Sequence, residues 1–113
     1  MHYTVEYKDN IVILDMKNKS VESDVSAELK AKLLVLAQPD IEALIVNMTN
    51  VDAVDSSGLG ALLLANRQLR EHAIPVILVG VKGFVKSLMT MTKIDEVFEF
   101  YPTIEEALAA LEQ

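Results

Sequence analysis

The spacing of apolar and polar residues predicts a regular succession of strands and helices along the chain. Residues 4–8 alternate in polarity, residues 11–14 form an apolar run, and Asp9 and Asn10 between them are typical turn residues. This pattern predicts a β-hairpin. Three later runs, apolar or rich in branched residues, predict further strands: residues 43–48, 76–80 and 97–100.

Four segments carry apolar residues at helical spacing. In the first, Val25, Leu29 and Leu33 recur at this spacing, which predicts a helix that Ser23 or Asp24 caps and that runs to about residue 37. The others are residues 55–72, residues 83–92 and the segment that begins at Thr103, where Glu106 completes a capping-box pattern. Residues 16–20 and 49–54 are predicted to be irregular.

This order of elements predicts an α/β fold. Helices that separate buried strands imply right-handed crossovers, hence a mostly parallel central sheet with the N-terminal hairpin at one edge and about four helices. A length of 113 residues suits a single domain over residues 1–113. The pattern leaves open whether the helices cover one face of the sheet or both.

Composition narrows the range of functions. The chain has no cysteine, which excludes disulfides, thiolate metal sites and cysteine nucleophiles. Its formal net charge of -7 disfavours nucleic acid and anionic membranes as partners and leaves a basic protein surface as a favourable one. The chain shows neither a signal-peptide pattern nor an apolar stretch long enough for a membrane helix, so we expect a cytoplasmic protein. No spacing of residues indicates a metal site.

The segment Asp55-Ser56-Ser57-Gly58-Leu59-Gly60 follows a buried strand and opens a predicted helix. Serine and aspartate are ordinary N-cap residues. The free N–H groups and the positive end of the helix dipole also favour an anion there, by about 0.3–2 kcal/mol for a phosphate. Each glycine costs a helix about 1 kcal/mol relative to alanine, so the pair predicts close approach of another backbone or of a partner group.

Two hydroxyls in this cap region make phosphorylation a natural hypothesis. A phosphate would add about -1.5 to -2 charges beside Asp55 and near Asp52. The helix terminus tolerates that charge, whereas a partner packed against the same turn would not. We therefore expect phosphorylation to change binding and to leave the fold nearly unchanged.

Together with residues 44–48 and Val51, these six residues resemble the signature of the STAS domain. This family includes the anti-sigma factor antagonists of bacteria and the cytoplasmic domains of sulfate transporters. The resemblance covers nearly the whole chain. It includes the order of elements, Gly80 after the fourth strand, and residues 84–89, which are similar to the family's third helix. It implies a small STAS-like fold.

The resemblance also implies a mechanism. An anti-sigma factor serine kinase would phosphorylate Ser56, while Asp55, Ser57, Gly58, Leu59 and Gly60 would form the helix cap and the partner contact. The unphosphorylated antagonist would bind the kinase-like anti-sigma factor and set a sigma factor free. Phosphorylation would end this binding, and a phosphatase of the PP2C type would restore it. Because ATP belongs to the kinase, the chain would be a substrate without a cofactor, not an enzyme.

Residues 15–24 depart from the family pattern. They lack the Gly-Glu-apolar-Asp turn that many members carry after the second strand, and they contain two lysines. A non-phosphorylated scaffold or a small-ligand-sensing module is therefore the alternative. A serine hydrolase is disfavoured because His72 lies about four turns down the helix from the serines. A phospho-receiver domain is disfavoured because Asp15 has no acidic neighbour.

The segment at residues 83–92 offers a second candidate surface. Phe84, Leu88 and Met91 are predicted to form its apolar face, yet one helix surface cannot bury these side chains and Met89 together. Methionine suits adaptable interfaces. Lys86, Met89 and Met91 are therefore candidate partner contacts.

Overall fold

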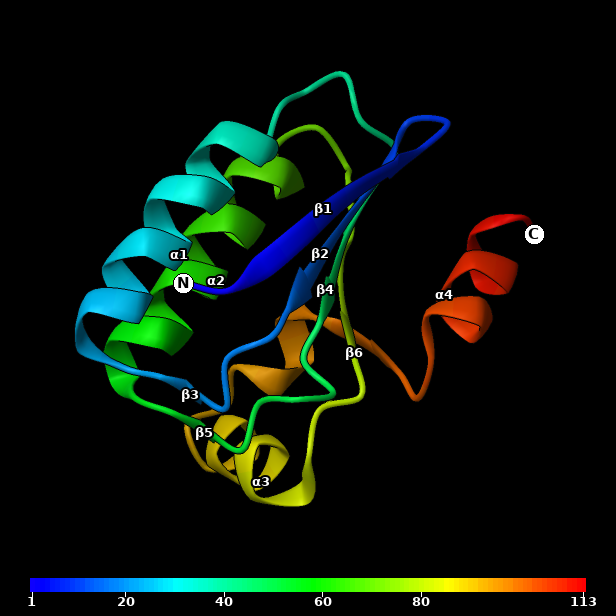
Figure 1. The fold of residues 1–113 in the computed structure, drawn as a ribbon. Helices are drawn as coiled ribbons and strands as arrows, with labels where there is room; N and C mark the ends of the chain where they lie inside the picture. The colour runs from blue at the N-terminus through cyan, green and yellow to red at the C-terminus, as the bar shows by residue number, and fades with distance from the viewer.

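Five strands form the central sheet of the protein, which a computed structural model describes over residues 1–113 (Figure 1). The strand order is β1-β2-β4-β6-β7. Strands β1 and β2 form the antiparallel hairpin, and every other pair in the sheet is parallel. The strands are β1 (Tyr3–Lys8), β2 (Ile11–Met16), β4 (Ala43–Asn47), β6 (Val76–Val79) and β7 (Glu99–Tyr101). The predicted α/β class and edge hairpin are confirmed.

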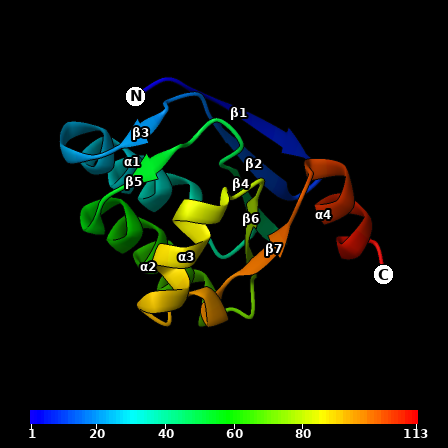
Figure 2. The same ribbon diagram turned by 90° about the horizontal axis from the view of Figure 1, so that it is seen from below.

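Helices cover both faces of this sheet. Helices α1 (Ser23–Leu36), α2 (Ser56–Arg70) and α3 (Gly83–Met91) lie on one side, and α4 (Ile104–Leu111) lies on the other (Figures 1 and 2). The sequence left open whether the helices cover one face of the sheet or both, and the structure shows that they cover both. No helix combines the length and the apolar character needed to cross a membrane.

The two-sided cover explains why the central strands carry apolar residues at successive positions. In β4, Leu44 and Val46 pack in the larger core with α1 and α2, whereas Ile45 between them packs in the smaller core under α4. All three side chains are buried. Successive residues of a strand point to opposite faces, so both faces need apolar side chains.

A second, two-stranded sheet lies beside the main one. It consists of β3 (Ser20–Val21) and β5 (Ala53–Val54), which pair in parallel. Both strands fall in or next to segments predicted to be irregular, so that prediction is wrong for residues 20 and 53–54. Two-residue strands are too short to carry a period-2 pattern, and here each is held by the partner strand.

The α1 cap and the start of β7 differ from the prediction, and the α4 cap agrees with it. Glu22 is the N-cap residue of α1 and makes no side-chain capping bond, so neither Ser23 nor Asp24 caps this helix. Residues Asp95–Val97 form a 3₁₀ turn, and β7 therefore begins at Glu99, later than predicted. The predicted cap of α4 is confirmed: the Glu106 amide donates to the Thr103 hydroxyl at 3.1 Å.

Candidate functional site

The small β3–β5 sheet fixes the position at which α2 begins. Strand β5 leads directly into Asp55, and the Asp55 amide donates to the Val21 carbonyl of β3 at 3.1 Å. Just before β5, the Asp52 amide donates to the Lys19 carbonyl at 2.7 Å. The two segments that flank the helix start are therefore tied together through their backbones. These backbone hydrogen bonds hold the N-terminus of α2 against β3.

Asp55 is the centre of a hydrogen-bond network at this helix start. Its Oδ1 atom accepts from the Ser57 hydroxyl at 2.6 Å and from the Gly58 amide at 2.9 Å. Two more donors come from the first turn of α1: the Ser26 hydroxyl at 3.2 Å to Oδ1, and the Ser23 amide at 3.3 Å to Oδ2. One carboxylate thus caps its own helix and also binds the start of α1.

This network lowers the pKa of Asp55 to about 2, chiefly through the hydrogen bond from Ser57, then through the one from the Gly58 amide, with smaller contributions from Ser23 and Ser26. Hydrogen bonds to the charged form favour that form. Asp55 is consequently a fixed negative charge at neutral pH. Ser56, the candidate phosphorylation site, is the next residue along the chain.

The two serines differ in their environment. Ser57 donates its hydroxyl to Asp55. Ser56 is exposed, and its hydroxyl makes no hydrogen bond within the chain. The Ser56 oxygen is therefore accessible without the loss of an internal hydrogen bond, whereas modification of the Ser57 oxygen would remove its hydrogen bond to Asp55. Neither hydroxyl is hydrogen-bonded to a histidine.

Gly58 and Gly60, which the sequence treats alike, have different surroundings. A Cβ atom on Gly58 would lie 2.7 Å from Val54 Cγ1 and 3.0 Å from the Val21 carbonyl oxygen. The missing side chain therefore allows the small β3–β5 sheet to pack closely against the start of α2. Gly58 is buried and cannot be a partner contact, which corrects the prediction. A Cβ atom on Gly60 would meet nothing within 4 Å, and this residue is exposed.

Two further contact predictions are wrong because the side chains belong to the core. Leu59 is 6% exposed and packs in the larger core. Met89 is fully buried, at 0% exposure. Both face inward because α2 and α3 present those positions to the sheet, so neither can meet a partner. Asp55, Ser56, Ser57 and Gly60 remain at the surface of the helix start.

Helix α3 exposes Phe84 and Met91 and buries Met89. Its inward side consists of Val85 and Met89, whereas Phe84 is 73% exposed and Met91 is 79% exposed. The predicted apolar face through Phe84 and Met91 is therefore an outer face. These are the two most exposed large apolar side chains of the molecule.

An ion pair joins this helix to the segment before the candidate phosphosite. Lys82, the N-cap residue of α3, pairs with Asp52 just before β5. The hydrogen bond from Lys82, together with its positive charge, holds the pKa of Asp52 below its ordinary value. Helix α3 also contacts β5 directly. The starts of α2 and α3 therefore lie at the same end of the molecule (Figure 1).

Ser26 is the member of the site that the sequence analysis missed. It is 2% exposed, and it is one of two buried polar residues in the protein. A signal was present, because Ser26 lies three residues before Leu29 and seven before Leu33, on the inward face of α1. A hydroxyl on a buried helix face needs a partner, and Asp55 supplies it.

Comparison with known proteins agrees with this fold. The model of the STAS domain family matches residues 2–107. An anti-sigma factor antagonist from Mycobacterium paratuberculosis is 21% identical, with a TM-score of 0.82, over 99% of this chain and 94% of that one.

Two further solved structures share the fold. The Bacillus cell fate determinant SpoIIAA in its phosphorylated form is 20% identical, with a TM-score of 0.76, over 97% of this chain and 99% of that one. A sulfate transporter family protein from Wolinella succinogenes is 19% identical, with a TM-score of 0.77, over 93% of this chain and 87% of that one. These likenesses concern the fold, and the family match extends over almost the entire sequence: the chain belongs to the STAS domain family.

Proposed function

We propose that this domain is an anti-sigma factor antagonist that works by partner switching in the cytoplasm. In its unphosphorylated form it binds a kinase-like anti-sigma factor through the surface around the start of α2. The kinase transfers a phosphoryl group from its ATP to the Ser56 oxygen, which loses its proton as ADP leaves. The phosphorylated domain is released, and a phosphatase of the PP2C type restores the hydroxyl.

The observation that carries this proposal is the contrast between the two neighbouring serines. Ser56 offers an exposed hydroxyl with no internal hydrogen bond, while the hydroxyl of Ser57 donates to Asp55 at 2.6 Å. A kinase can modify the first hydroxyl without breaking a hydrogen bond of the Asp55 network, to which the second hydroxyl belongs. SpoIIAA, a protein of the same fold, has a phosphorylated form, which adds support.

Electrostatics explains how one phosphate can end binding. At neutral pH the modified Ser56 would carry about -1.5 to -2 charges, directly beside the Asp55 carboxylate, whose pKa is about 2. The amides of the first turn and the helix dipole offset part of this charge within the domain. A partner packed against the turn gains no such compensation and meets a strongly anionic, hydrated group. Binding is lost while the fold persists.

The exposed face of α3 is suited to extend the partner contact beyond the start of α2. Phe84 and Met91 are large, apolar and accessible, and α3 is joined to the phosphosite segment through the Lys82–Asp52 ion pair. Interfaces commonly combine such apolar anchors with a polar rim. We propose that the partner covers the α2 start and this α3 face together.

Phosphate transfer tests the proposal. The domain is incubated with the kinase-like anti-sigma factor of its own host and ATP, and intact mass is measured. We expect one added phosphate on the natural sequence and on Ser57→Ala, and none on Ser56→Ala. An unmodified natural domain, still bound to its partner after ATP is added, would favour the alternative of a non-phosphorylated scaffold.

A further inference from the structure

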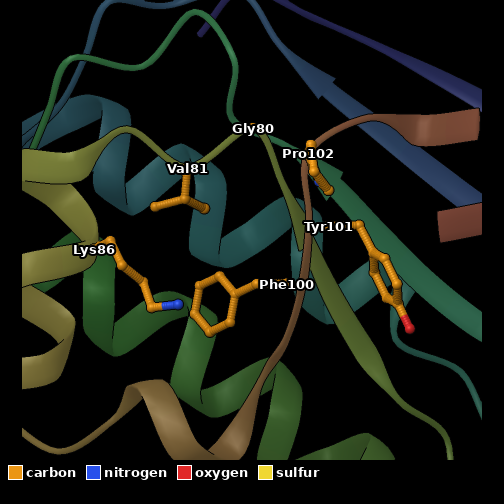
Figure 3. Close-up of a pocket in the computed structure, with 6 residues that line it drawn as sticks. All are labelled: Gly80, Val81, Lys86, Phe100, Tyr101 and Pro102. Carbon is orange, nitrogen blue, oxygen red and sulfur yellow. The ribbon is translucent and has the colours of Figure 1, made fainter. Parts of the chain in front are cut away.

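A cavity of about 350 Å³ opens where β6 and β7 end. Its walls come from the residues that follow β6, from the end of β7 and from one side chain of α3 (Figure 3). None of the residues 55–60 lines it. Six residues do: Gly80, Val81, Lys86, Phe100, Tyr101 and Pro102.

Lys86 supplies the only charge on the cavity wall. Its ammonium lies 3.6 Å from the centroid of the Phe100 ring, and the two side chains point toward one another in Figure 3. The ring attracts the cation and holds it at this place. No carboxylate pairs with Lys86, in contrast to Lys17 and Lys82, which pair with Asp15 and Asp52. A cation thus faces the cavity without a counter-ion, in a protein whose net charge is -7.

The remaining walls are apolar and well fixed. The Gly80 amide donates to the Tyr101 carbonyl at 3.0 Å, which ties the end of β6 to the end of β7. Val81 and Pro102 add apolar surface, and Phe100 packs edge-to-face on Phe98 with ring centroids 6.5 Å apart. The cation is therefore presented by a pre-formed wall, and a ligand would not have to order it.

We propose that this cavity binds a small organic anion, in which one carboxylate or phosphate group is attached to a compact apolar body. The anionic group would pair with the Lys86 ammonium, whose N–H donors have no acceptor within the chain, and the body would contact Val81 and Pro102. A volume of about 350 Å³ lies at the lower end of the range for ligand sites, so the ligand is small. None of the residues 55–60 lines this site, so it is distinct from Ser56, and its test does not require the proposed partner.

Amide chemical shifts of the ¹⁵N-labelled full chain test this site. The probes are benzoate, phenyl phosphate, inorganic phosphate and benzyl alcohol. We expect benzoate or phenyl phosphate to shift the amides of Gly80, Val81 and Tyr101 in a saturable way, and whichever of the two binds more tightly identifies the anionic group. Inorganic phosphate and the neutral alcohol should each bind more weakly than the better aromatic anion.

Two lysine variants decide the outcome. Lys86→Gln should weaken binding of the better probe at least about tenfold, because the positive charge that pairs with the anion is lost. Lys93→Gln makes the same charge change just beyond α3 and outside the cavity, and it should bind as the natural sequence does. Shifts that do not saturate, or that persist unchanged in Lys86→Gln while its spectrum shows an intact fold, would overturn the proposal.

Discussion

At the scale of single residues, the site is organised by the Asp55 carboxylate and not by the serines. It accepts bonds from the starts of two helices, and it leaves Ser56 as the free hydroxyl. The sequence alone identified Asp55 and both serines as cap residues. It could not distinguish the bonded serine from the free one, because either hydroxyl can reach a neighbouring carboxylate and the choice depends on the backbone.

The acid sensitivity of the fold should reveal the Asp55 network. Its folded-state pKa of about 2 lies below the ordinary value of 3.8, so its contribution to stability is complete above the unfolded pKa and is lost as pH falls through the folded pKa. Asp55→Asn should be less stable than the natural sequence at pH 7. The difference between them should shrink between about pH 4 and pH 2.

Thermal unfolding of both proteins across this pH range provides the measurement. Asp95→Asn is the matched control, because the only side chain that donates to the Asp95 carboxylate is Thr90, at 3.5 Å, whereas four donors surround Asp55. Equal stability of Asp55→Asn and the natural sequence at pH 7 would show that these four hydrogen bonds carry no net stabilisation.

At the scale of elements, the two glycines of α2 offer a matched pair. Gly58→Ala should destabilise the fold by about 1–3 kcal/mol, because the added methyl group overlaps Val54 and the Val21 carbonyl. Gly60→Ala meets nothing within 4 Å and should stabilise the helix by up to about 1 kcal/mol. Urea unfolding measures both free energies. A stabilised Gly58→Ala would contradict the account of the β3–β5 contact.

Helix α3 provides a second pair. Met89→Ala removes a fully buried side chain and should cost about 2–5 kcal/mol. Met91→Ala changes an exposed side chain and should alter the free energy of unfolding by no more than about 0.5 kcal/mol. Met91→Ala, but not the conservative Met91→Leu, should weaken partner binding in a pull-down if this face belongs to the docking surface. Unweakened binding of Met91→Ala would remove Met91 from that surface.

Two features that the sequence analysis got wrong have different physical causes. Phe84, Leu88 and Met91 follow helical spacing and looked like a buried face, but α3 is short and turns Val85 and Met89 toward the sheet instead. The spacing of apolar residues identifies a face of a helix, but it does not show whether that face is turned toward the core. Strands β3 and β5 were missed for another reason: their pairing joins residues more than thirty positions apart, and such contacts leave no local pattern.

At the scale of the whole molecule, most of the architecture was predictable. Apolar runs without alternation predicted buried strands, and the intervening helices predicted parallel pairing. The sequence did not show which helix crosses to the second face. That place belongs to α4, whose Ala107 is packed against Ile45 and Ile77. Its short apolar side is similar to those of the other helices, so composition could not single it out.

The molecule also presents two surfaces with different chemistry. The α2 start presents carboxylates and a free hydroxyl, whereas the cavity at the ends of β6 and β7 presents the Lys86 ammonium. The two proposals assign a small anion to the cavity and a kinase to the α2 start. They are tested by independent experiments.

The most direct test of the central claim compares the affinity of two forms of the domain for the kinase-like anti-sigma factor. One carries phosphoserine at position 56, introduced during synthesis, and the other is unmodified. Calorimetry should show tight binding of the unmodified form and a Kd weaker by at least about a hundredfold for the phosphorylated form, while both unfold at nearly the same temperature. Equal affinity of two equally folded forms would contradict the account.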